Sequence, residues 1–244
     1  MQRARFLDVI YTHTSGGVLG IVHSGVRYPV GADIVEQRRF LEQNCDWIRR
    51  AIVFEPRGYE NMYGLFLTPP SRPGSHGGIV FFDQAGFLDG CGHGTIGLTM
   101  AMVSYGLVEE TRPATTINLD TVAGPITVSV AVSDAGVESS GIENVPAFIV
   151  ERNVPVEVPG IGELKADIAF GGNFFALIEW NHPDIKIGPE YASRLREVGI
   201  HVKRTLNARL RLRHPTKDSV DPKIAIVTLY NSRDATDGDI RNVH

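Results

Sequence analysis

The chain has 244 residues, 43% of them hydrophobic, and a formal net charge of −4, so it can bury the core of one large domain or of two ordinary ones. The near-balanced charge, without a long basic run, argues against nucleic acid as a partner. The apolar runs are shorter than the roughly 18 residues of a membrane-spanning helix and no signal-peptide core is present, so we expect no membrane contact and a cytoplasmic location.

Short apolar runs predict a fold rich in strands. They are separated by many of the 26 glycines and 14 prolines, which is typical of sheets joined by turns. Several runs alternate apolar and polar residues, which indicates sheets with one buried face. The predicted strands are residues 18–23, 51–55, 63–68, 78–82, 116–119, 126–132, 147–151, 154–158, 165–170, 174–179 and 223–230.

Three segments predict helices. Residues 34–50 and 189–210 are amphipathic, and we expect the second to be interrupted near Gly199. Residues 92–105 are apolar nearly all round, with Gly106 placed to end the helix. A helix without a polar face is a buried helix, so we expect a barrel-like sheet closed around residues 92–105.

The strand series restarts after about Asn144. We therefore predict two units, an N-terminal half over residues 1–143 and a C-terminal half over residues 144–244. The second half contains strands and amphipathic helices but no counterpart of the buried helix.

Cys91 lies in a glycine-rich turn directly before the predicted buried helix. Unpaired N–H groups at a helix start should lower the pKa of the thiol and let an anionic group bind beside it. Gly90, Gly92 and Gly94 leave out Cβ atoms, so a ligand can approach the backbone closely. A lone cysteine among apolar residues is more often a small core residue, but these neighbours favour a reactive thiol. A thiol beside a carboxylate site can move a proton at the α-carbon of an amino acid.

The remaining candidates carry weaker signals. Cys45 lies in a charged helical segment, and we assign it to structure. The two cysteines lack the paired spacing of a disulfide framework or a zinc site, which fits a reducing compartment. His93 has no second histidine at ligand spacing, so among metal-ligand, structural and substrate-donor roles we favour a donor to bound substrate.

Seven motifs, in order along the chain, resemble the proline racemase superfamily of proline racemases, hydroxyproline 2-epimerases and trans-3-hydroxyproline dehydratases. They are Thr12-His13-Thr14, Glu55-Pro56-Arg57-Gly58, Cys91-Gly92-His93-Gly94-Thr95-Ile96-Gly97, Leu119-Asp120-Thr121-Val122-Ala123-Gly124, Asn144-Val145-Pro146-Ala147-Phe148, Gly171-Gly172-Asn173-Phe174-Phe175 and Arg241-Asn242-Val243.

The resemblance implies an α/β (α+β) fold of two pseudo-symmetric halves, each a strand barrel around a central helix, as in diaminopimelate epimerase. It implies an isomerase of amino-acid metabolism without metal or pyridoxal phosphate, in which one cysteine from each half flanks the substrate α-carbon. Cys91 matches the first catalytic cysteine, and Gly92 and His93 match residues that hold the substrate carboxylate and amine. Tyr63 falls where a side chain lines the substrate ring. Family members are often dimers, so a homodimer is one expected assembly.

The sequence departs from the family after Arg241-Asn242-Val243. The family continues there with a second catalytic segment, Asp-Arg-Ser-Pro-Cys-Gly-Thr-Gly-Thr, which this sequence does not contain. We therefore expect a C-terminally truncated member whose second half is incomplete and lacks its central helix. Apolar strand faces such as residues 224–229 should be poorly covered, and the chain should aggregate and show little or no epimerase activity.

Three functions remain open on the sequence. The leading one is cofactor-independent racemisation or epimerisation at the α-carbon of proline or 4-hydroxyproline by two thiols, with Cys91 as one base. The second is a trans-3-hydroxy-L-proline dehydratase, because the residue that separates the two reactions belongs to the missing segment. The third is an inactive remnant that binds an amino acid or nothing. In each enzyme reading the partner is a small-molecule substrate.

Overall fold

The computed structural model describes residues 6–214, 222–231 and 240–243. The chain divides into two compact units, Met1–Val145 and Pro146–His244. Among the described residues, no helix is both long enough and apolar enough to cross a membrane.

The first unit is built on one eight-stranded sheet, with strands in the order β1-β2-β3-β4-β6-β7-β8 and β5 paired to β4. The β2–β3 and β4–β6 pairs are parallel and the other pairs are antiparallel. The strands are β1 (Asp8–Thr14), β2 (Gly17–Ser24), β3 (Tyr63–Thr68), β4 (Gly77–Phe82), β5 (Phe87–Leu88), β6 (Ala114–Thr121), β7 (Pro125–Ser133) and β8 (Gly136–Glu143). Of these, β1, β5 and β8 lie outside the predicted runs.

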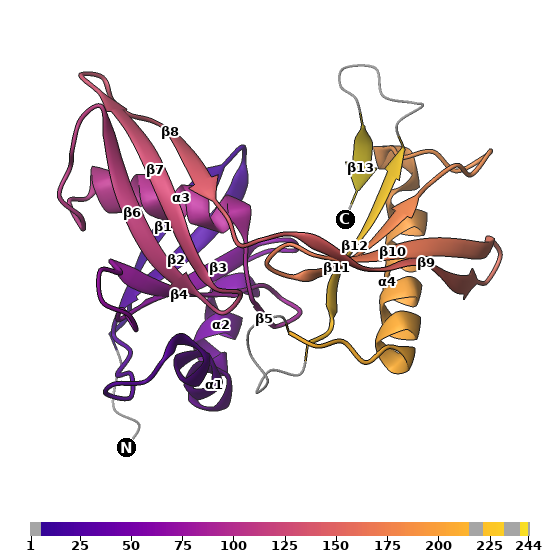
Figure 1. The fold of residues 1–244 in the computed structure, drawn as a ribbon, viewed down its shortest axis with the longest axis horizontal. Helices are drawn as coiled ribbons and strands as arrows, with labels where there is room; N and C mark the ends of the chain where they lie inside the picture. Colours follow the sequence, from indigo (N-terminus) through magenta and orange to yellow (C-terminus); the bar gives the residue numbers. More distant parts are fainter. Residues whose placement is uncertain (1–5, 215–221, 232–239, 244) are drawn as a thin grey trace. The chain divides into compact units, whose positions relative to one another are not determined.

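The predicted buried helix is present as α3 (Gly92–Ser104), which packs against β1, β2, β3, β7 and β8 (Figure 1). Its end follows the Schellman pattern, because the Gly106 N–H donates to the Val103 carbonyl and the Leu107 N–H to the Met102 carbonyl, at 3.0 and 2.8 Å. Gly106 has a φ of 67°, which favours glycine there.

The prediction of a closed barrel around this helix is wrong. In the part of the chain that the structure describes, β1 and β8 are the two ends of the sheet and do not pair with each other. Both strands contact α3 instead. The helix thus fills the gap between the sheet ends, and the sheet is curled around it rather than closed.

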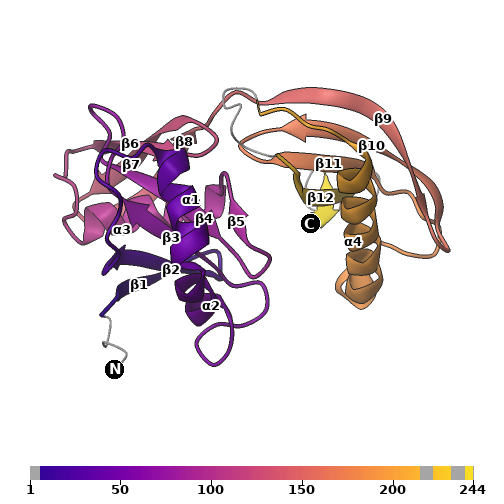
Figure 2. The same ribbon diagram turned by 90° about the horizontal axis from the view of Figure 1, so that it is seen from below.

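The predicted helix over residues 34–50 is two helices, α1 (Ile34–Asn44) and α2 (Asp46–Val53), which meet at Cys45 (Figure 2). The strand predicted over residues 51–55 is wrong, because α2 continues through Val53. Residues 48 and 52, one helical turn apart, are both buried, so a helical period accounts for this apolar run as well as a strand does.

Strand β4 is covered on both faces, and all six of its residues are buried. A Cβ built on Gly78 would lie 2.8 Å from Ile34 of α1, and one built on Gly94 of α3 would lie 2.8 Å from Phe81. Small residues therefore let a helix approach each face of this strand closely.

The second unit is a five-stranded sheet in the order β13-β12-β11-β10-β9. The predicted strands over residues 147–151 and 154–158 form one continuous strand. Within it the backbone is irregular, since Asn153 takes a positive φ of 54° and the register to β10 shifts twice. Such an irregularity bends a strand without ending it. The strands are β9 (Phe148–Val158), β10 (Gly162–Phe170), β11 (Phe174–Glu179), β12 (Ile224–Asn231) and β13 (Arg241–Val243).

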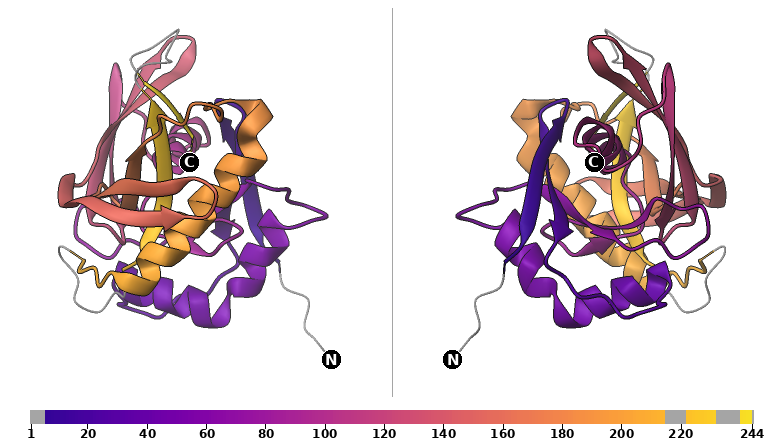
Figure 3. Two further views of the ribbon diagram at one scale, coloured as in Figure 1. Left: turned by 90° about the vertical axis from the view of Figure 1, so that its right-hand side faces the viewer. Right: turned by 90° about the vertical axis from the view of Figure 1, so that its left-hand side faces the viewer.

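One face of this second sheet carries α4 (Ala192–Arg209), which follows a short 3-10 turn, η1 (Pro189–Tyr191), and packs on β9 and β12 (Figure 3). The helix runs through Gly199 without the interruption that we predicted. The expectation that residues 224–229 would be poorly covered is also wrong for the inward-facing side chains, since Ile224, Val227 and Leu229 are buried. The amphipathic face of α4, with Val198, Val202 and Leu206 buried, is what covers this sheet.

Candidate active site

Helix α3 begins where the sequence predicts, and Cys91 is its N-cap residue. Cys91 has extended backbone angles, φ −155° and ψ 111°, and its Sγ accepts the Gly94 N–H at 3.3 Å. The side chain is neither fully buried nor fully exposed. The sulfur therefore takes the place of the oxygen that usually caps a helix start, where backbone donors favour negative charge.

The predicted lowering of the Cys91 pKa is wrong. Burial raises the pKa of the thiol, the N–H groups of Gly94 and His93 lower it, and the nearby Asp83 carboxylate raises it, with a net increase above the ordinary value. Removal of the thiolate from water thus outweighs the donors of the helix start. At neutral pH the Cys91 sulfur carries its proton.

The side chains of His93 and Tyr63 meet at the start of α3. Tyr63, from β3, lies edge-on to the His93 ring, with ring centroids 6.5 Å apart and an interplanar angle of 88°. Burial, together with the charges of Cys91 and Tyr59, raises the pKa of Tyr63 to about 12. Tyr63 therefore remains neutral over the whole range in which a thiol titrates, and its hydroxyl donates to the Gly17 carbonyl at 3.3 Å.

The four residues predicted for the site, Cys91, Gly92, His93 and Tyr63, thus lie together at one end of α3. Gly92 is exposed, and a Cβ built there would meet nothing within 4 Å. The backbone at the start of α3 is therefore open to a ligand.

The start of α3 is held by strand β1. The Thr14 hydroxyl donates to the His93 carbonyl at 3.1 Å. Gly97 allows this approach, because a Cβ on it would lie 2.8 Å from Thr12 Oγ1 and 3.4 Å from Thr14 Oγ1. The Thr12-His13-Thr14 motif did not predict this contact, because nothing local to residues 12–14 shows which helix they face.

Helix α2 holds the turn that precedes Cys91. Arg49 donates to the carbonyls of Asp83 and Gln84 at 2.8 and 2.9 Å. The Gln84 side chain in turn donates to the Val53 carbonyl at 2.7 Å and to the Tyr59 carbonyl at 3.0 Å. The sequence did not predict these contacts, which join residues more than 24 positions apart.

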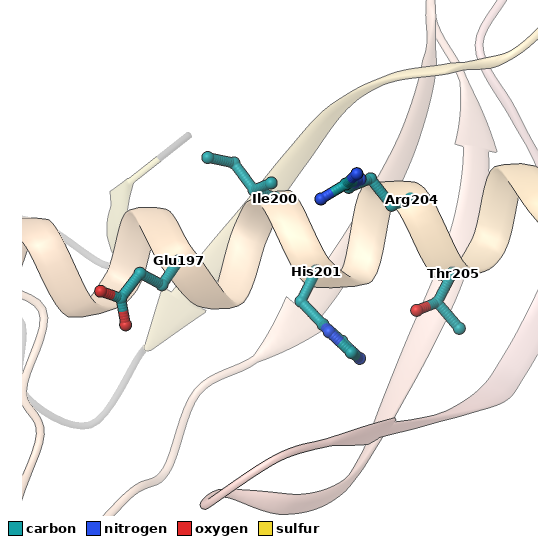
Figure 4. A pocket seen from close by; sticks show the side chains of 5 residues that line it. All are labelled: Glu197, Ile200, His201, Arg204 and Thr205. Atoms are coloured by element: carbon teal, nitrogen blue, oxygen red, sulfur yellow. The ribbon is translucent and has the colours of Figure 1, made fainter.

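Among the described residues, no group of three or more His, Cys, Asp or Glu side chains is placed to hold a metal ion. An open groove runs along α4 and contains none of the predicted residues; it is lined by Glu197, Ile200, His201, Arg204 and Thr205 (Figure 4).

One groove residue, His201, and two arginines elsewhere on α4 contact the sheet of their own unit. The His201 ring lies within hydrogen-bond distance, 3.0 Å, of the Glu157 carbonyl on β9. Arg194 and Arg209 donate to the Pro159 and Pro155 carbonyls at 3.2 and 2.7 Å. These α4 side chains cover the edge of β9 that pairs with no strand among the described residues and would otherwise be open to pairing.

A family model described as proline racemase matches residues 9–244 of this chain. The chain is 40% identical over 238 residues to a 4-hydroxyproline 2-epimerase of Cereibacter sphaeroides (strain ATCC 17029 / ATH 2.4.9), covering 97% of this chain and 70% of the relative. It is 35% identical over 243 residues to a proline racemase of Clostridioides difficile, covering 100% of this chain and 72% of the relative.

A solved structure is similar over the same extent. It is a hydroxyproline epimerase of Agrobacterium vitis with bound trans-4-OH-L-proline, with a TM-score of 0.89 and 25% identity, and the match covers 99% of this chain and 70% of that chain. This likeness confirms the mixed α/β fold predicted from the sequence.

Proposed function

This chain belongs to the proline racemase family, and we propose that Cys91 is one of two acid–base groups for racemisation or epimerisation at the α-carbon of proline or 4-hydroxyproline. The observation that carries the proposal is the Cys91 sulfur at the N-cap of a buried helix, beside His93 and Tyr63. The named activities of the relatives support the substrate class.

The start of α3 supplies what the reaction needs at the substrate carboxylate. An α-proton is a very weak acid, so negative charge that grows on the carboxylate must be stabilised as the proton leaves. Preorganised backbone donors and the positive end of a helix do this without reorganisation. The open backbone at Gly92 is where we place the carboxylate.

Cys91 then transfers the proton. Because its pKa is raised, the resting sulfur is a thiol and delivers a proton to one face of the planar carbanion. In the reverse direction the thiolate removes that proton, and the Gly94 N–H at 3.3 Å stabilises the charged sulfur.

The opposite face needs a second group, because a planar carbanion reprotonated from its original side returns the starting enantiomer. The other cysteine of this sequence, Cys45, is 6% exposed and lies between α1 and α2, so we do not assign it this role. His93, whose side chain is exposed, is proposed to donate to the substrate, and the neutral Tyr63 ring to line the substrate ring.

Protection of Cys91 from alkylation tests the proposal. We expect iodoacetamide to label Cys91, and pyrrole-2-carboxylate, a planar mimic of the carbanion, to slow the labelling as measured by peptide mass spectrometry. Pyrrolidine, which has the ring without the carboxylate, serves as the matched control and should not protect.

The outcomes separate the two enzyme functions from each other and from a remnant that binds nothing. Equal labelling of Cys91 with and without pyrrole-2-carboxylate would favour an inactive remnant and contradict the proposal. Protection by trans-3-hydroxy-L-proline but not by proline or 4-hydroxyproline would favour the dehydratase.

A further inference from the structure

Asp89 places a negative charge two residues before the N-cap of α3. Only residues 89–91 separate β5 from the helix, and the middle one is Gly90, which rotates without a Cβ clash. A carboxylate so close to a helix start is attracted to its free N–H groups, and aspartate is among the preferred N-cap residues. Asp89 is therefore a built-in competitor for the donors that the Cys91 sulfur and a bound carboxylate would use.

In the structure, an arginine from another element holds Asp89. Arg38 of α1 forms an ion pair with Asp89, and both side chains are largely buried, at 18% and 13% exposure. The same guanidinium pairs with Glu42 one turn along α1, Nε to Oε1 at 2.8 Å. The Asp89 backbone is held too, because its carbonyl accepts the Ala123 N–H at 3.3 Å.

We propose that Arg38 is a positioning residue that keeps the Asp89 carboxylate away from the start of α3, so that its N–H groups remain available to the Cys91 sulfur and to a bound carboxylate. This deepens the proposed function and rests on it. Removing Arg38 while keeping Asp89 should occupy those donors, whereas removing both should free them again.

The other ionisable groups around the sulfur stay constant in this comparison. Among the described residues they include the Asp83 carboxylate from the turn after β4, which raises the pKa of Cys91, the Tyr63 phenol from β3, whose own pKa is raised by Cys91, and the His93 ring at the helix start. A change in Cys91 reactivity among Arg38 and Asp89 variants therefore reports on those two residues.

The experiment measures the 244-residue chain at pH 8.5, where part of the thiol is ionised. Two quantities are followed: the rate constant for alkylation of Cys91 by iodoacetamide, and the pyrrole-2-carboxylate concentration that halves this rate. For Arg38→Met we expect alkylation to slow about threefold and the half-protecting concentration to rise about 3- to 10-fold, the size of a charge effect at a helix start. Arg38→Lys, which keeps the charge, should restore most of both values.

The double variant Arg38→Met/Asp89→Ala is the decisive one. Both quantities should return to within about twofold of the starting chain, which a loss of packing at Arg38 would not allow. Arg39→Met is the matched control, because Arg39 is the exposed neighbour on α1, and it should change neither quantity.

Three results would overturn the inference. The first is an Arg38→Met chain whose alkylation rate and half-protecting concentration equal those of the starting chain, and the second is a double variant in which both values differ from the starting chain as much as in Arg38→Met. The third is an Asp89→Ala chain that is alkylated more slowly than the starting chain. If Arg38→Met does not fold, the alkylation rate of Asp89→Ala tests the inference instead. If pyrrole-2-carboxylate fails to protect even the starting chain, the proposed function fails, while the alkylation rates still test Arg38.

Discussion

At the scale of the residue, two opposing effects act on the Cys91 sulfur. The N–H groups of Gly94 and His93 favour the thiolate, and burial disfavours it more strongly. A base that is too acidic removes an α-proton poorly, since proton transfer is most efficient when the base is close in strength to what the reaction requires. A half-buried thiol with a raised pKa is a stronger base once ionised than one fully exposed at a helix start.

The pH dependence of alkylation tests this balance. Because only the thiolate reacts and the pKa of Cys91 is raised, the rate constant for Cys91 should rise steeply from pH 8 to pH 9 and go on rising above pH 9. A short unstructured cysteine peptide with both ends blocked, with an ordinary thiol pKa of about 8.5, is the reference and should begin to level off in that range. A plateau for Cys91 below pH 8 would show that the helix start outweighs burial.

At the scale of the element, glycine decides how close α3 comes to the sheet. Gly97→Ala would place a Cβ 2.8 Å from Thr12 Oγ1 and 3.1 Å from Leu19 Cδ2. We expect it to lower the free energy of unfolding by about 1–2 kcal/mol, the overpacking cost less the gain in helix propensity.

Gly199→Ala in α4 is the matched control, since a Cβ there meets nothing within 4 Å. It should raise the free energy of unfolding by up to about 1 kcal/mol. Urea unfolding of both variants measures the difference, and equal effects would mean that α3 does not approach β1 as closely as described.

A buried carboxylate ties the loop after β3 to β6. Asp120 is 2% exposed and accepts the Ser71 N–H at 2.8 Å, the Ser71 hydroxyl at 2.9 Å and the Arg72 Nε at 2.5 Å. Burial by itself would raise the pKa of Asp120, but the bonds from Ser71 and Arg72 lower it overall.

We therefore expect Asp120→Ala to lower the free energy of unfolding by about 3 kcal/mol, because buried donors lose their acceptor. Arg72→Ala should lower the free energy of unfolding by less than about 1 kcal/mol, since the Arg72 side chain is 47% exposed.

Because the pKa of Asp120 is lowered, the contribution of its carboxylate to the free energy of unfolding is present above about pH 4 and is lost as the pH falls through the lowered value. Urea unfolding between pH 3 and 7 should show this loss in the starting chain, and a similar acid loss in Asp120→Ala would contradict the assignment.

At the scale of the whole molecule, the thiol count limits the chemistry. The sequence contains two cysteines, and Cys45 is buried. We predict that the purified 244-residue chain does not invert L-proline or trans-4-hydroxy-L-proline measurably, because one thiol serves only one face of the α-carbon. Chiral chromatography checks this, with Cys91→Ala as the blank, and inversion well above that blank would refute the prediction.

Much of the architecture was predictable because the local periodicity of apolar residues indicates where strands and helices lie. The strand over residues 63–68 and the helix start at residue 92 were found at their observed positions. The helical residues 51–53 were not, because a short apolar run fits both a strand and one helical turn. Strands β1 and β8 were missed, because the contacts with α3 that complete them come from distant parts of the chain.

The residues of the candidate site divide in the same way. Cys91, Gly92 and His93 are consecutive, so a motif finds them together, and the family was recognisable from such motifs alone. The place of Tyr63 beside His93, the pairing of Arg38 with Asp89 across 51 positions, and the sign of the Cys91 pKa shift were settled only by the tertiary structure. The physical reason is that burial and long-range charge depend on which elements pack together, whereas turns, caps and periodicity depend on neighbours along the chain.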